Sequence, residues 1–578
     1  MKTGFTLAVL LMSTSLSAKP LLPETNQDLE TIIDAMSIEE KVGQLLLIGF
    51  SGKQVTPHIR RWVGDRKVGG VAIFARNIES TEQIARFTRG IQSLTKRSVP
   101  AFISLDQEGG NVIRLKDGAT VLPGNMALGA TRSTALSYVA GQALGTDLKR
   151  LGFNMNLAPV LDVNSNPSNP VIGIRSYGEK PELVGALGTW FVRGQQEAGV
   201  TGVAKHFPGH GDTQSDSHFA MPSIPTSIER LRNLELVPFE RAIAAGLDAV
   251  MTAHIALPKV AEEPNLPATL SYKILTEELR ERMGFEGIVI TDGLEMQGIV
   301  EQYGAGTAAV RAILAGADIA MILWTNSKKE EVYRALIQAV KRGTITMDRL
   351  DQSVRRILRV KLKRDLFKRD LPSLRSVLRD GNRNKVHRRV AERIATESIT
   401  LVRNHGDVLP LRSVRYRKVV VMSPSGEFAN TMAKPKFTKV FRVPYRPSRA
   451  RRSAEVKRMV REGKNADALV MVAVNRYHIT MIKEVTRQLP HVPVTVVSFA
   501  SPYYLESMPD VDGYICTYSY QKAAQRAAAK AILGKSAMTG RLPVTIPGFY
   551  EYGHRANHPM AISRQFPQLS LHEAALLR

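Results

Sequence analysis

Eight short apolar runs alternate with helical stretches between residues 45 and 323, and this alternation restricts the fold more than any other feature of the chain. The runs cover residues 45–50, 68–74, 101–105, 153–159, 200–204, 249–252, 288–290 and 318–323. Strands that alternate with helices favour a parallel sheet, and eight such units predict a (β/α)8 barrel of the TIM type. An open, doubly wound sheet is the alternative, but no Gly-x-Gly-x-x-Gly follows the first run to support it.

A second, smaller α/β region follows the barrel. Apolar strands at 419–422, 468–474, 494–499 and 513–516 alternate with helices that include 481–488 and 523–533, a pattern typical of a three-layer sandwich. We therefore expect a signal peptide at 1–18, a barrel domain at 19–367, a linker at 368–390 and a C-terminal α/β sandwich domain at 391–578. Residues 434–461 are rich in Lys and Arg, which indicates a solvated basic face or a mobile insertion, with contact to a wall polymer as the alternative.

The N-terminus has the pattern of a short secretory signal. Lys2 precedes an apolar stretch at 5–12, and small polar residues lead to Ala18, near which we expect cleavage. The stretch is too short to span a membrane, and no other run is long and apolar enough to do so. These features predict export to the periplasm, the cell envelope or the medium, with no transmembrane segment.

The formal net charge of +26 predicts polyanionic surroundings such as nucleic acid, acidic lipid or an acidic cell wall. No basic motif interleaved with aromatic residues, no zinc spacing and no recognition-helix pattern accompanies this charge, so we expect no specific nucleic-acid binding. Cys516 is the one cysteine, which excludes an intrachain disulfide and a cysteine-based metal cluster. It lies in an apolar run and is expected to be an inert core thiol.

The segment 204–218 concentrates polar side chains directly after the fifth apolar run. Its Pro and Gly residues indicate a surface loop on a rigid scaffold. Asp216 and His218 stand two residues apart, so in an extended loop the carboxylate can hold the imidazole in one tautomer and raise its proton affinity. A polar loop with a salt-bridged His is the structural alternative. Together with Lys205 and His206 upstream, the segment is interpreted as an active site.

Other polar side chains follow the ends of further predicted strands. Asp292 stands at the end of the seventh predicted strand. A buried carboxylate there costs free energy unless it is hydrogen-bonded or takes part in function. A role as a strand-end cap or as the N-cap of the following helix is equally compatible with this position. Asp106 occupies the equivalent place on the third unit and shares this ambiguity. Arg175 lies on the long loop after the fourth predicted strand, where its guanidinium could form bidentate hydrogen bonds to hydroxyls or carboxylates. His206 and His210 could suggest zinc, but no clean metal spacing is present.

This set of residue types suits sugar chemistry. Glycosyl transfer with retention requires a nucleophile on one face of the anomeric carbon and an acid/base close to it. The acid is usually a second carboxyl group, but a His supported by an Asp could shuttle the same proton near neutral pH.

Several runs of the chain resemble family-3 glycoside hydrolases, specifically their exo-β-N-acetylglucosaminidase subgroup. The matching runs are 42–44, 73–77, 106–110, 156–163, 171–177, 205–218 and 291–292. The run 205–218 is the specific one, since the β-glucosidases and xylosidases of the family resemble it only in the Lys-His pair. The runs 397–401, 409–411 and 540–544 are similar to the second domain of the family, which extends the resemblance nearly to the C-terminus.

The resemblance implies a role for each candidate residue. Asp292 would be the nucleophile, His218 the acid/base and Asp216 its partner. Hydroxyls of the terminal N-acetylglucosamine would be held by Asp106, Arg175, Lys205 and His206. The implied substrates are peptidoglycan fragments that end in N-acetylglucosamine linked to (anhydro)muramic acid, whose carboxylates suit a basic surface. The family needs no metal or other cofactor, and its second domain would here only shape the cleft.

Three alternatives stay open at this point. A variant of the same enzyme could use phosphate as acceptor, because a His acid/base repels an incoming anion less than a carboxylate does. The chain could also be a β-glucosidase-type member of the family, against which Asp216 and His218 argue. Finally, it could be a catalytically silent wall-binding protein whose barrel is a scaffold.

Overall fold

A computed structural model describes residues 23, 25–215, 221–369, 371, 373–379 and 381–557 of the 578-residue chain. The predicted signal peptide at 1–18 lies outside these residues, as do the predicted acid/base His218 and its partner Asp216.

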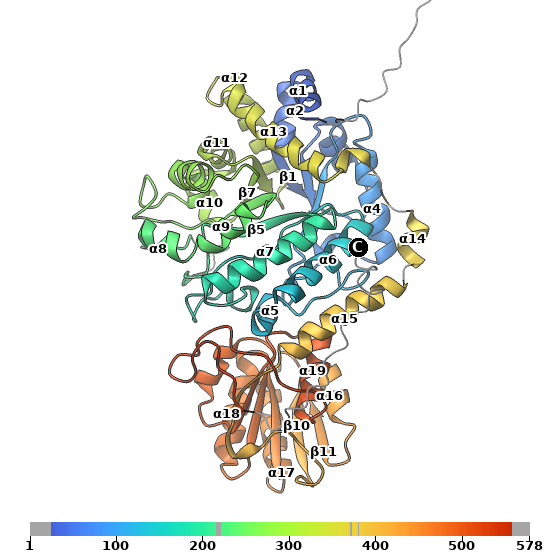
Figure 1. The fold of residues 1–578 in the computed structure, drawn as a ribbon, viewed down its shortest axis with the longest axis vertical. Coiled ribbons are helices and arrows are strands. Elements are labelled where there is room, and N and C mark those ends of the chain that lie inside the picture. Colours follow the sequence, from blue (N-terminus) through green and yellow to red (C-terminus); the bar gives the residue numbers. More distant parts are fainter. Residues whose placement is uncertain are drawn as a thin grey trace, which may run out of the picture.

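The first part of the molecule is a closed barrel of eight parallel strands in the order β1 to β8, with β8 paired back to β1. The strands are β1 (Leu46–Gly49), β2 (Gly70–Ala72), β3 (Phe102–Leu105), β4 (Met155–Asn156), β5 (Thr201–Phe207), β6 (Ala249–Thr252), β7 (Ile288–Gly293) and β8 (Ile319–Ile322). Each predicted run contains a strand, so the barrel is confirmed (Figure 1).

Helices surround the barrel because each buries one apolar face against the strands. Ser37 is the N-cap of α2 and forms a capping box with Glu40, and Ile84, Phe87 and Ile91 lie on the buried face of α4. The helices of this part are α1 (Asn26–Ala35), α2 (Ile38–Gln44), α3 (Pro57–Ile59), η1 (Arg60–Asp65), η2 (Ala75–Asn77), α4 (Thr81–Ser93), α5 (Asn125–Thr131), α6 (Thr134–Arg150), η3 (Gly173–Arg175), α7 (Pro181–Glu197), α8 (Ile228–Asn233), α9 (Val237–Ala244), η4 (Ala268–Leu270), η5 (Lys273–Arg282), α10 (Gln297–Tyr303), α11 (Ala305–Ala315), α12 (Asn326–Lys341), α13 (Met347–Lys363) and η6 (Leu366–Lys368).

Strand β4 is much shorter than its apolar run, whereas β5 and β7 extend beyond theirs. The run 153–159 contributes only the two residues of β4, because the chain turns away at Leu157 to begin a long loop. In contrast, β5 continues past its apolar run through Lys205, His206 and Phe207. Lys205 and His206 therefore belong to the strand itself, which fixes their direction more firmly than a loop would.

The second domain is a six-stranded sheet in the order β11-β10-β12-β13-β14-β9. Its strands are β9 (Thr400–Asn404), β10 (Val419–Ser423), β11 (Thr438–Arg442), β12 (Ala468–Ala473), β13 (Val494–Ser498) and β14 (Gly513–Cys516). Four of them coincide with the predicted strands, whereas β9 and β11 were not predicted. All neighbours are parallel except β9, which runs antiparallel to β14.

Both faces of this sheet are buried, which confirms the three-layer arrangement. Val420 and Met422 of β10 belong to the apolar cluster that includes Ile482 of α18 (Arg476–Gln488). Alternate residues Val419 and Val421 belong to a separate cluster with Ala528. The other helices of this part are α16 (Gly426–Met432), α17 (Arg449–Gly463), η7 (His405–Asp407), η8 (Pro502–Ser507) and α19 (Lys522–Ile532).

The basic stretch 434–461 is ordered rather than a mobile insertion: it forms the edge strand β11 and most of α17. The predicted linker 368–390 contains α14 (Leu374–Arg379) and the first part of α15 (Gly381–Glu397), which packs against α6 and α19. The domain boundaries themselves stay a prediction.

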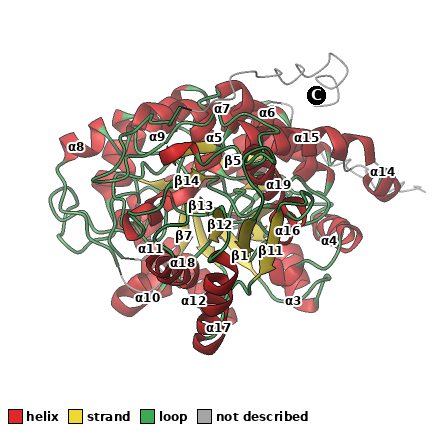
Figure 2. Ribbon diagram, turned by 90° about the horizontal axis from the view of Figure 1, so that it is seen from below, coloured by secondary structure: helices red, strands yellow, loops and turns green. Residues whose placement is uncertain are grey.

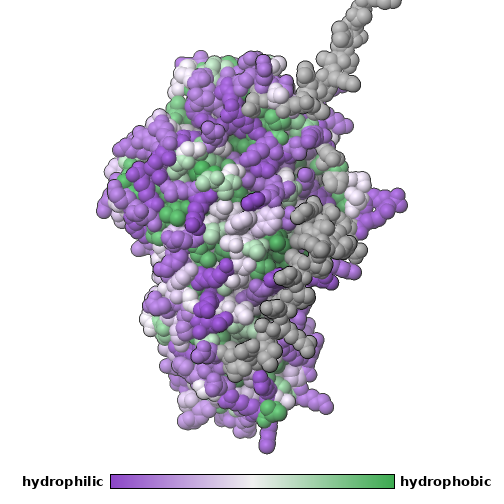
Figure 3. All heavy atoms as spheres, viewed as in Figure 1, coloured by the Kyte–Doolittle hydropathy of each residue, from purple (hydrophilic) through white to green (hydrophobic). Residues whose placement is uncertain are grey.

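The two domains lie end to end, with α15 running from one to the other (Figure 1). Helices α17 and α18 face the viewer when the molecule is seen from its second-domain end (Figure 2). The face drawn in Figure 3 is largely hydrophilic, as expected for a molecule whose apolar side chains fill the barrel and both sides of the sheet.

Candidate active site

A pocket of about 200 Å³ opens at the carboxyl ends of the barrel strands, where barrel enzymes place their active sites. The five described candidate residues all line it: Asp106, Arg175, Lys205, His206 and Asp292. They come from the ends of β3, β5 and β7 and from the turn η3 in the loop after β4. The structure therefore brings together residues that are up to 186 positions apart (106 and 292) in the sequence.

Lys205 lies at the centre of a buried group of charges on the floor of this pocket. Its Nζ atom is 2.9 Å from Oδ1 of Asp106 and 2.8 Å from Oε1 of Glu108. Arg175 donates from Nε and Nη2 to the two oxygens of Glu108, at 2.9 Å each, and Arg114 donates to Oδ2 of Asp106 at 2.9 Å. Two carboxylates and three cations thus satisfy one another in a site largely closed to water.

These contacts shift the pKa values of Asp106, Glu108, Lys205 and Arg175 in the directions that keep these four groups charged. Burial alone would raise the pKa of Asp106 and of Glu108, but the nearby cations lower both values. Burial would lower the pKa of Lys205, yet the two carboxylates raise it. The Arg175 pKa is raised in the same way by Glu108. The pocket floor consequently holds fixed charges that can pair with sugar hydroxyls.

His206 is oriented by the buried carboxylate of Asp162, which was not among the candidate residues. Asp162 accepts from the His206 backbone N at 3.1 Å and from the His210 backbone N at 2.7 Å, both through Oδ1, and its Oδ2 lies 2.7 Å from His206 Nδ1. The contact with Asp162 fixes the ring so that Nε2 faces Arg175, at 3.4 Å from its Nη2. Asp162 therefore holds the strand end and the start of the following loop together.

The rings of His210 and His206 meet edge to face, with their centroids 5.9 Å apart. Burial, together with the neighbouring His206, lowers the pKa of His210 to about 4, so its ring is neutral at physiological pH. Its Nδ1 contacts the hydroxyl of Thr213 at 2.8 Å. Among the described residues no group of three or more His, Cys, Asp or Glu side chains is arranged to hold a metal ion.

Asn169 connects the loop that carries Arg175 to the loop that leads toward Asp216 and His218. Its Nδ2 donates to the backbone oxygens of His210 and Gly211, at 2.9 and 3.0 Å. Its Oδ1 accepts from the backbone nitrogens of Val171 and Ile172. The two loops are therefore held in one arrangement up to residue 215, where the described part of the second loop ends.

Asp292 lies at the end of β7 and is half-buried, so its carboxylate is accessible from the pocket. The backbone nitrogen of Gly293 donates to Asp292 Oδ1 at 2.7 Å. On the other side of this turn, the backbone oxygen of Gly293 lies 3.1 Å from Nε2 of the buried His254. The strand end is thus fixed in position while its half-buried carboxylate lines the same pocket as the charged floor residues, an arrangement that could serve a nucleophile.

The pocket is also lined by polar and aromatic side chains that were not assigned a catalytic or sugar-binding role from the sequence, among them Glu108, Arg114, His210 and Trp324. Glu108 had a signal, because it stands two residues after Asp106, a spacing that lets both side chains point the same way. Asp162, beneath the pocket, lies in the run 156–163 that carried the resemblance. Trp324 lies two residues after the end of β8, at the same end of the barrel as the candidate residues.

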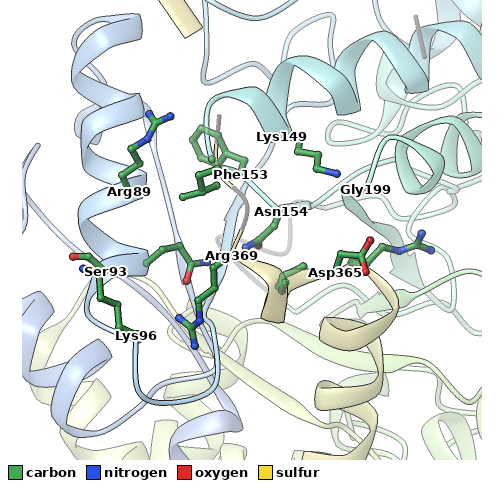
Figure 4. Close-up of a pocket in the computed structure, with 14 residues that line it drawn as sticks. Arg89, Ser93, Lys96, Lys149, Phe153, Asn154, Gly199, Asp365 and Arg369 are labelled. Carbon is green, nitrogen blue, oxygen red and sulfur yellow. The ribbon is translucent and has the colours of Figure 1, made fainter. Parts of the chain in front are cut away.

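A second cavity of about 220 Å³ lies at the opposite, amino end of the strands (Figure 4). Arg89, Lys96 and Lys149 extend in different directions around it rather than toward one point. Asp365 is the one carboxylate among the described residues that line it, and it pairs with Lys368 at 2.9 Å. This cavity therefore lacks the converging carboxylates and cations that mark the pocket at the carboxyl ends.

Comparison with known proteins adds to this geometry. Residues 37–360 match the family model described as the glycosyl hydrolase family 3 N terminal domain. The chain is 37% identical to beta-hexosaminidase A of Pseudoalteromonas piscicida over 379 residues, which is 62% of each chain, so the alignment spans less than two thirds of that relative.

Two further proteins resemble nearly the whole chain. A beta-N-acetylglucosaminidase/beta-glucosidase of Cellulomonas fimi is 31% identical over 549 residues, which cover 89% of this chain and 94% of that protein. The solved glycoside hydrolase family 3 beta-N-acetylglucosaminidase of Paenibacillus sp. str. FPU-7 is 37% identical and superposes with a TM-score of 0.83, covering 89% of this chain and 99% of the other.

Proposed function

Because this chain belongs to glycosyl hydrolase family 3, we propose that it is a retaining exo-β-N-acetylglucosaminidase that removes terminal N-acetylglucosamine from peptidoglycan fragments. The observation that carries the proposal is the position of Asp292 in one pocket with the buried charges of Asp106, Glu108, Arg175 and Lys205. A half-buried carboxylate beside a rigid hydroxyl-binding floor is what a glycosyl-enzyme intermediate requires. The names of the Pseudoalteromonas, Cellulomonas and Paenibacillus proteins support the choice of sugar.

The proposed reaction proceeds in two displacements. In the first, a carboxylate oxygen of Asp292 bonds to the anomeric carbon while His218 gives its proton to the departing glycosidic oxygen. In the second, His218 takes a proton from water, the water oxygen bonds to the anomeric carbon, and Asp292 leaves as a carboxylate. Asp216 would hold the imidazole of His218 in the required tautomer.

The floor residues would act by holding the sugar. The carboxylates of Asp106 and Glu108 can accept from hydroxyls, and Lys205 and Arg175 can donate to hydroxyl oxygens, while His206, held by Asp162, would line the same site. Because these groups are already paired and oriented before substrate binds, little reorganisation is needed during the reaction.

Export of the protein, and contact of its basic surface with an anionic wall polymer, belong to the same proposal. The sequence pattern at residues 1–18 and the net charge of +26 support them. Among the described residues no helix combines the length and the apolar character that crossing a membrane requires. Cell fractionation tests the first point. Cosedimentation with purified wall at rising salt tests the second, since screened surface charges should release it.

The decisive experiment compares an aryl β-N-acetylglucosaminide with the matching aryl β-glucoside, using the wild type and Asp292→Ala. We expect turnover of the N-acetylglucosaminide, loss of that turnover in Asp292→Ala with unchanged circular dichroism, and little activity on the glucoside. Equal rates on both sugars would favour the glucosidase alternative, and silence of a folded wild type would favour a wall-binding protein. Repeating the assay with added phosphate separates hydrolysis from phosphorolysis, because only the second makes a sugar phosphate.

The role of His218 has its own test. His218→Ala should slow a substrate with a poor leaving group, such as a disaccharide, far more than an aryl glycoside whose leaving group needs no proton. Equal losses on both substrates would remove His218 from the position of acid.

A further inference from the structure

Trp324 is an exposed aromatic ring at the mouth of the catalytic pocket. It lies two residues after the end of β8, lines the pocket and is 44% exposed. The charged residues of the floor are buried by comparison: Lys205 is 2% and Glu108 3% exposed. Trp324 therefore lies at the opening of the pocket, beyond the groups that would hold the terminal sugar.

The indole lies against the turn that carries Asp292. A Cβ atom placed on Gly293 would be 3.5 Å from Cη2 and 3.6 Å from Cζ3 of the indole, which is van der Waals contact. The six-membered ring of Trp324 thus packs beside the residue that follows the proposed nucleophile. A leaving group that departs from the anomeric carbon above Asp292 passes this ring.

The backbone of Trp324 is held unusually firmly for an exposed residue. Both oxygens of Glu295 accept from its turn: Leu323 N donates at 2.6 Å, Trp324 N at 2.7 Å and Thr325 N at 2.6 Å. From the other side, Arg76 Nη2 donates to the Leu323 backbone oxygen at 3.2 Å. Glu295 itself follows Asp292 by three residues, so one carboxylate ties the position of the indole to the position of the nucleophile.

We propose that Trp324 is a specificity-determining residue that stacks against the ring of the departing group, so that the enzyme prefers aglycones with a flat apolar face, such as a pyranose. Sugar rings present C–H bonds on their faces, and an exposed, fixed indole binds such a surface at a low cost in side-chain entropy. An isolated exposed tryptophan needs no explanation on most surfaces. Here the ring lines the pocket and is fixed to the nucleophile turn.

This inference rests on the proposed function, and its test separates the two. The kinetic arm compares N,N′-diacetylchitobiose, whose leaving group is a sugar ring, with N-acetylglucosaminyl fluoride, whose leaving group has no ring. Trp324→Ala should lower kcat/KM on the disaccharide by about ten-fold or more and change the fluoride by less than about two-fold, and Trp324→Phe should restore most of the loss. A similar loss on both substrates, or none on either, would overturn the proposal.

Trp190 provides the matched control, because it is 38% exposed on the outer helix α7 and does not line the pocket. Trp190→Phe should leave both rates unchanged. The melting temperatures of all variants are measured beside the rates, so that a loss from misfolding is recognised.

A binding arm needs no turnover. The chain has three tryptophans, of which Trp62 is fully buried. In Asp292→Ala, titration with the disaccharide should change the tryptophan fluorescence, and the change should vanish in Asp292→Ala/Trp324→Phe but persist in Asp292→Ala/Trp190→Phe. If the wild type cleaves no N-acetylglucosaminide, the proposed function fails while a Trp324-dependent signal still supports the stacking role. A signal that survives Trp324→Phe would overturn it.

Discussion

Arg175 and Glu108 form a bidentate ion pair in which the Nε and Nη2 atoms of the guanidinium each lie 2.9 Å from a carboxylate oxygen. The pair connects the loop after β4 to the end of β3. The same carboxylate also forms an ion pair with Lys205 of β5. Glu108 therefore joins three parts of the pocket floor. The geometry of the floor therefore depends on the negative charge of Glu108 as much as on the shape of its side chain.

Glu108→Gln should accordingly damage both stability and activity. The amide keeps the size of the side chain but leaves Arg175 and Lys205 with too little negative charge in a buried site, which costs about 3 kcal/mol of the free energy of unfolding. We expect a lower melting temperature and a kcat/KM reduced by at least about 100-fold. Glu179→Gln, at the domain interface, is the control, and a Glu108→Gln enzyme with wild-type kcat/KM would contradict this role.

The same cluster predicts how stability responds to acid. The folded-state pKa values of Asp106 and Glu108 are lowered, so these groups bind fewer protons in the folded than in the unfolded chain. Their contribution is fully present above the unfolded values, near pH 4 to 4.5, and is lost as the pH falls through the folded values. Urea unfolding from pH 6 down to pH 3 should show this decline, and it should be smaller in Glu108→Gln.

Glu235 should make the free energy of unfolding depend on pH in the opposite direction. It supports the loop after β5, since a Cβ on Gly209 would lie 2.7 Å from its Cβ. Burial raises the Glu235 pKa to about 7, although Arg230, 3.2 Å from Oε1 and also paired with Asp212, opposes the shift. The folded chain thus keeps a proton that the unfolded chain loses, so stability falls as the pH rises from about 4.5 to above 7.

Glu235→Gln removes this dependence. The amide stays neutral at every pH, so the variant should be more stable than the wild type at pH 8 by about 1–3 kcal/mol and similar to it at pH 5. Urea denaturation at the two pH values measures the difference. A wild type whose stability does not change between pH 5 and 8 would rule out the raised pKa.

Asp318 allows stability to be separated from catalysis. It is buried at the amino end of β8, opposite the pocket, and contacts the guanidinium groups of Arg280 and Arg356 and the backbone nitrogen of Val289. Asp318→Asn leaves these cations without their shared counter-charge. The variant should therefore lose about 3–5 kcal/mol of the free energy of unfolding, as measured by urea denaturation. The kcat/KM of the protein that still folds should stay within about two-fold of the wild type, since no group at the carboxyl ends changes.

The barrel could be predicted from the sequence because its signals are local. Each strand is a short apolar run bounded by polar residues, and burial on both faces makes that run continuous. β11 was missed because Lys439 and Arg442 are exposed on an edge strand, so its sequence resembles a solvated surface. Edge strands of this kind carry charge to avoid pairing with other chains, which hides their periodicity.

The site could be predicted only in part. Asp106, Arg175, Lys205, His206 and Asp292 lie at the carboxyl ends of strands or in the loops after them, and a barrel brings such positions together whatever their separation in the sequence. The partners that orient them depend on through-space contacts. Asp162 lies in a loop of otherwise ordinary composition, and only the closed barrel places its carboxylate against His206. No spacing rule predicts that contact.

The second domain touches both segments that support the pocket, and this gives the last prediction. Tyr503 OH accepts from Asn164 Nδ2 at 2.9 Å, two residues after Asp162, and Gln521 Nε2 donates to the backbone oxygen of Gly110, two residues after Glu108. Each hydrogen bond contributes about 1 kcal/mol to holding its pocket segment in place. Tyr503→Phe/Gln521→Leu should therefore lower kcat/KM by about five- to thirty-fold with a small change in melting temperature, because the two supports act on the floor residues.

Tyr552→Phe is the matched control for that double variant. Its hydroxyl accepts from Arg132 Nη1 at 2.8 Å, so it removes a hydrogen bond between the domains without touching either pocket segment. We expect Tyr552→Phe to keep wild-type kcat/KM while losing a comparable amount of stability. If both variants lose activity equally, the second domain stabilises the molecule as a whole, and if neither does, the barrel positions the floor without help. Only a selective loss in Tyr503→Phe/Gln521→Leu means that the second domain acts on the pocket through Asn164 and Gly110.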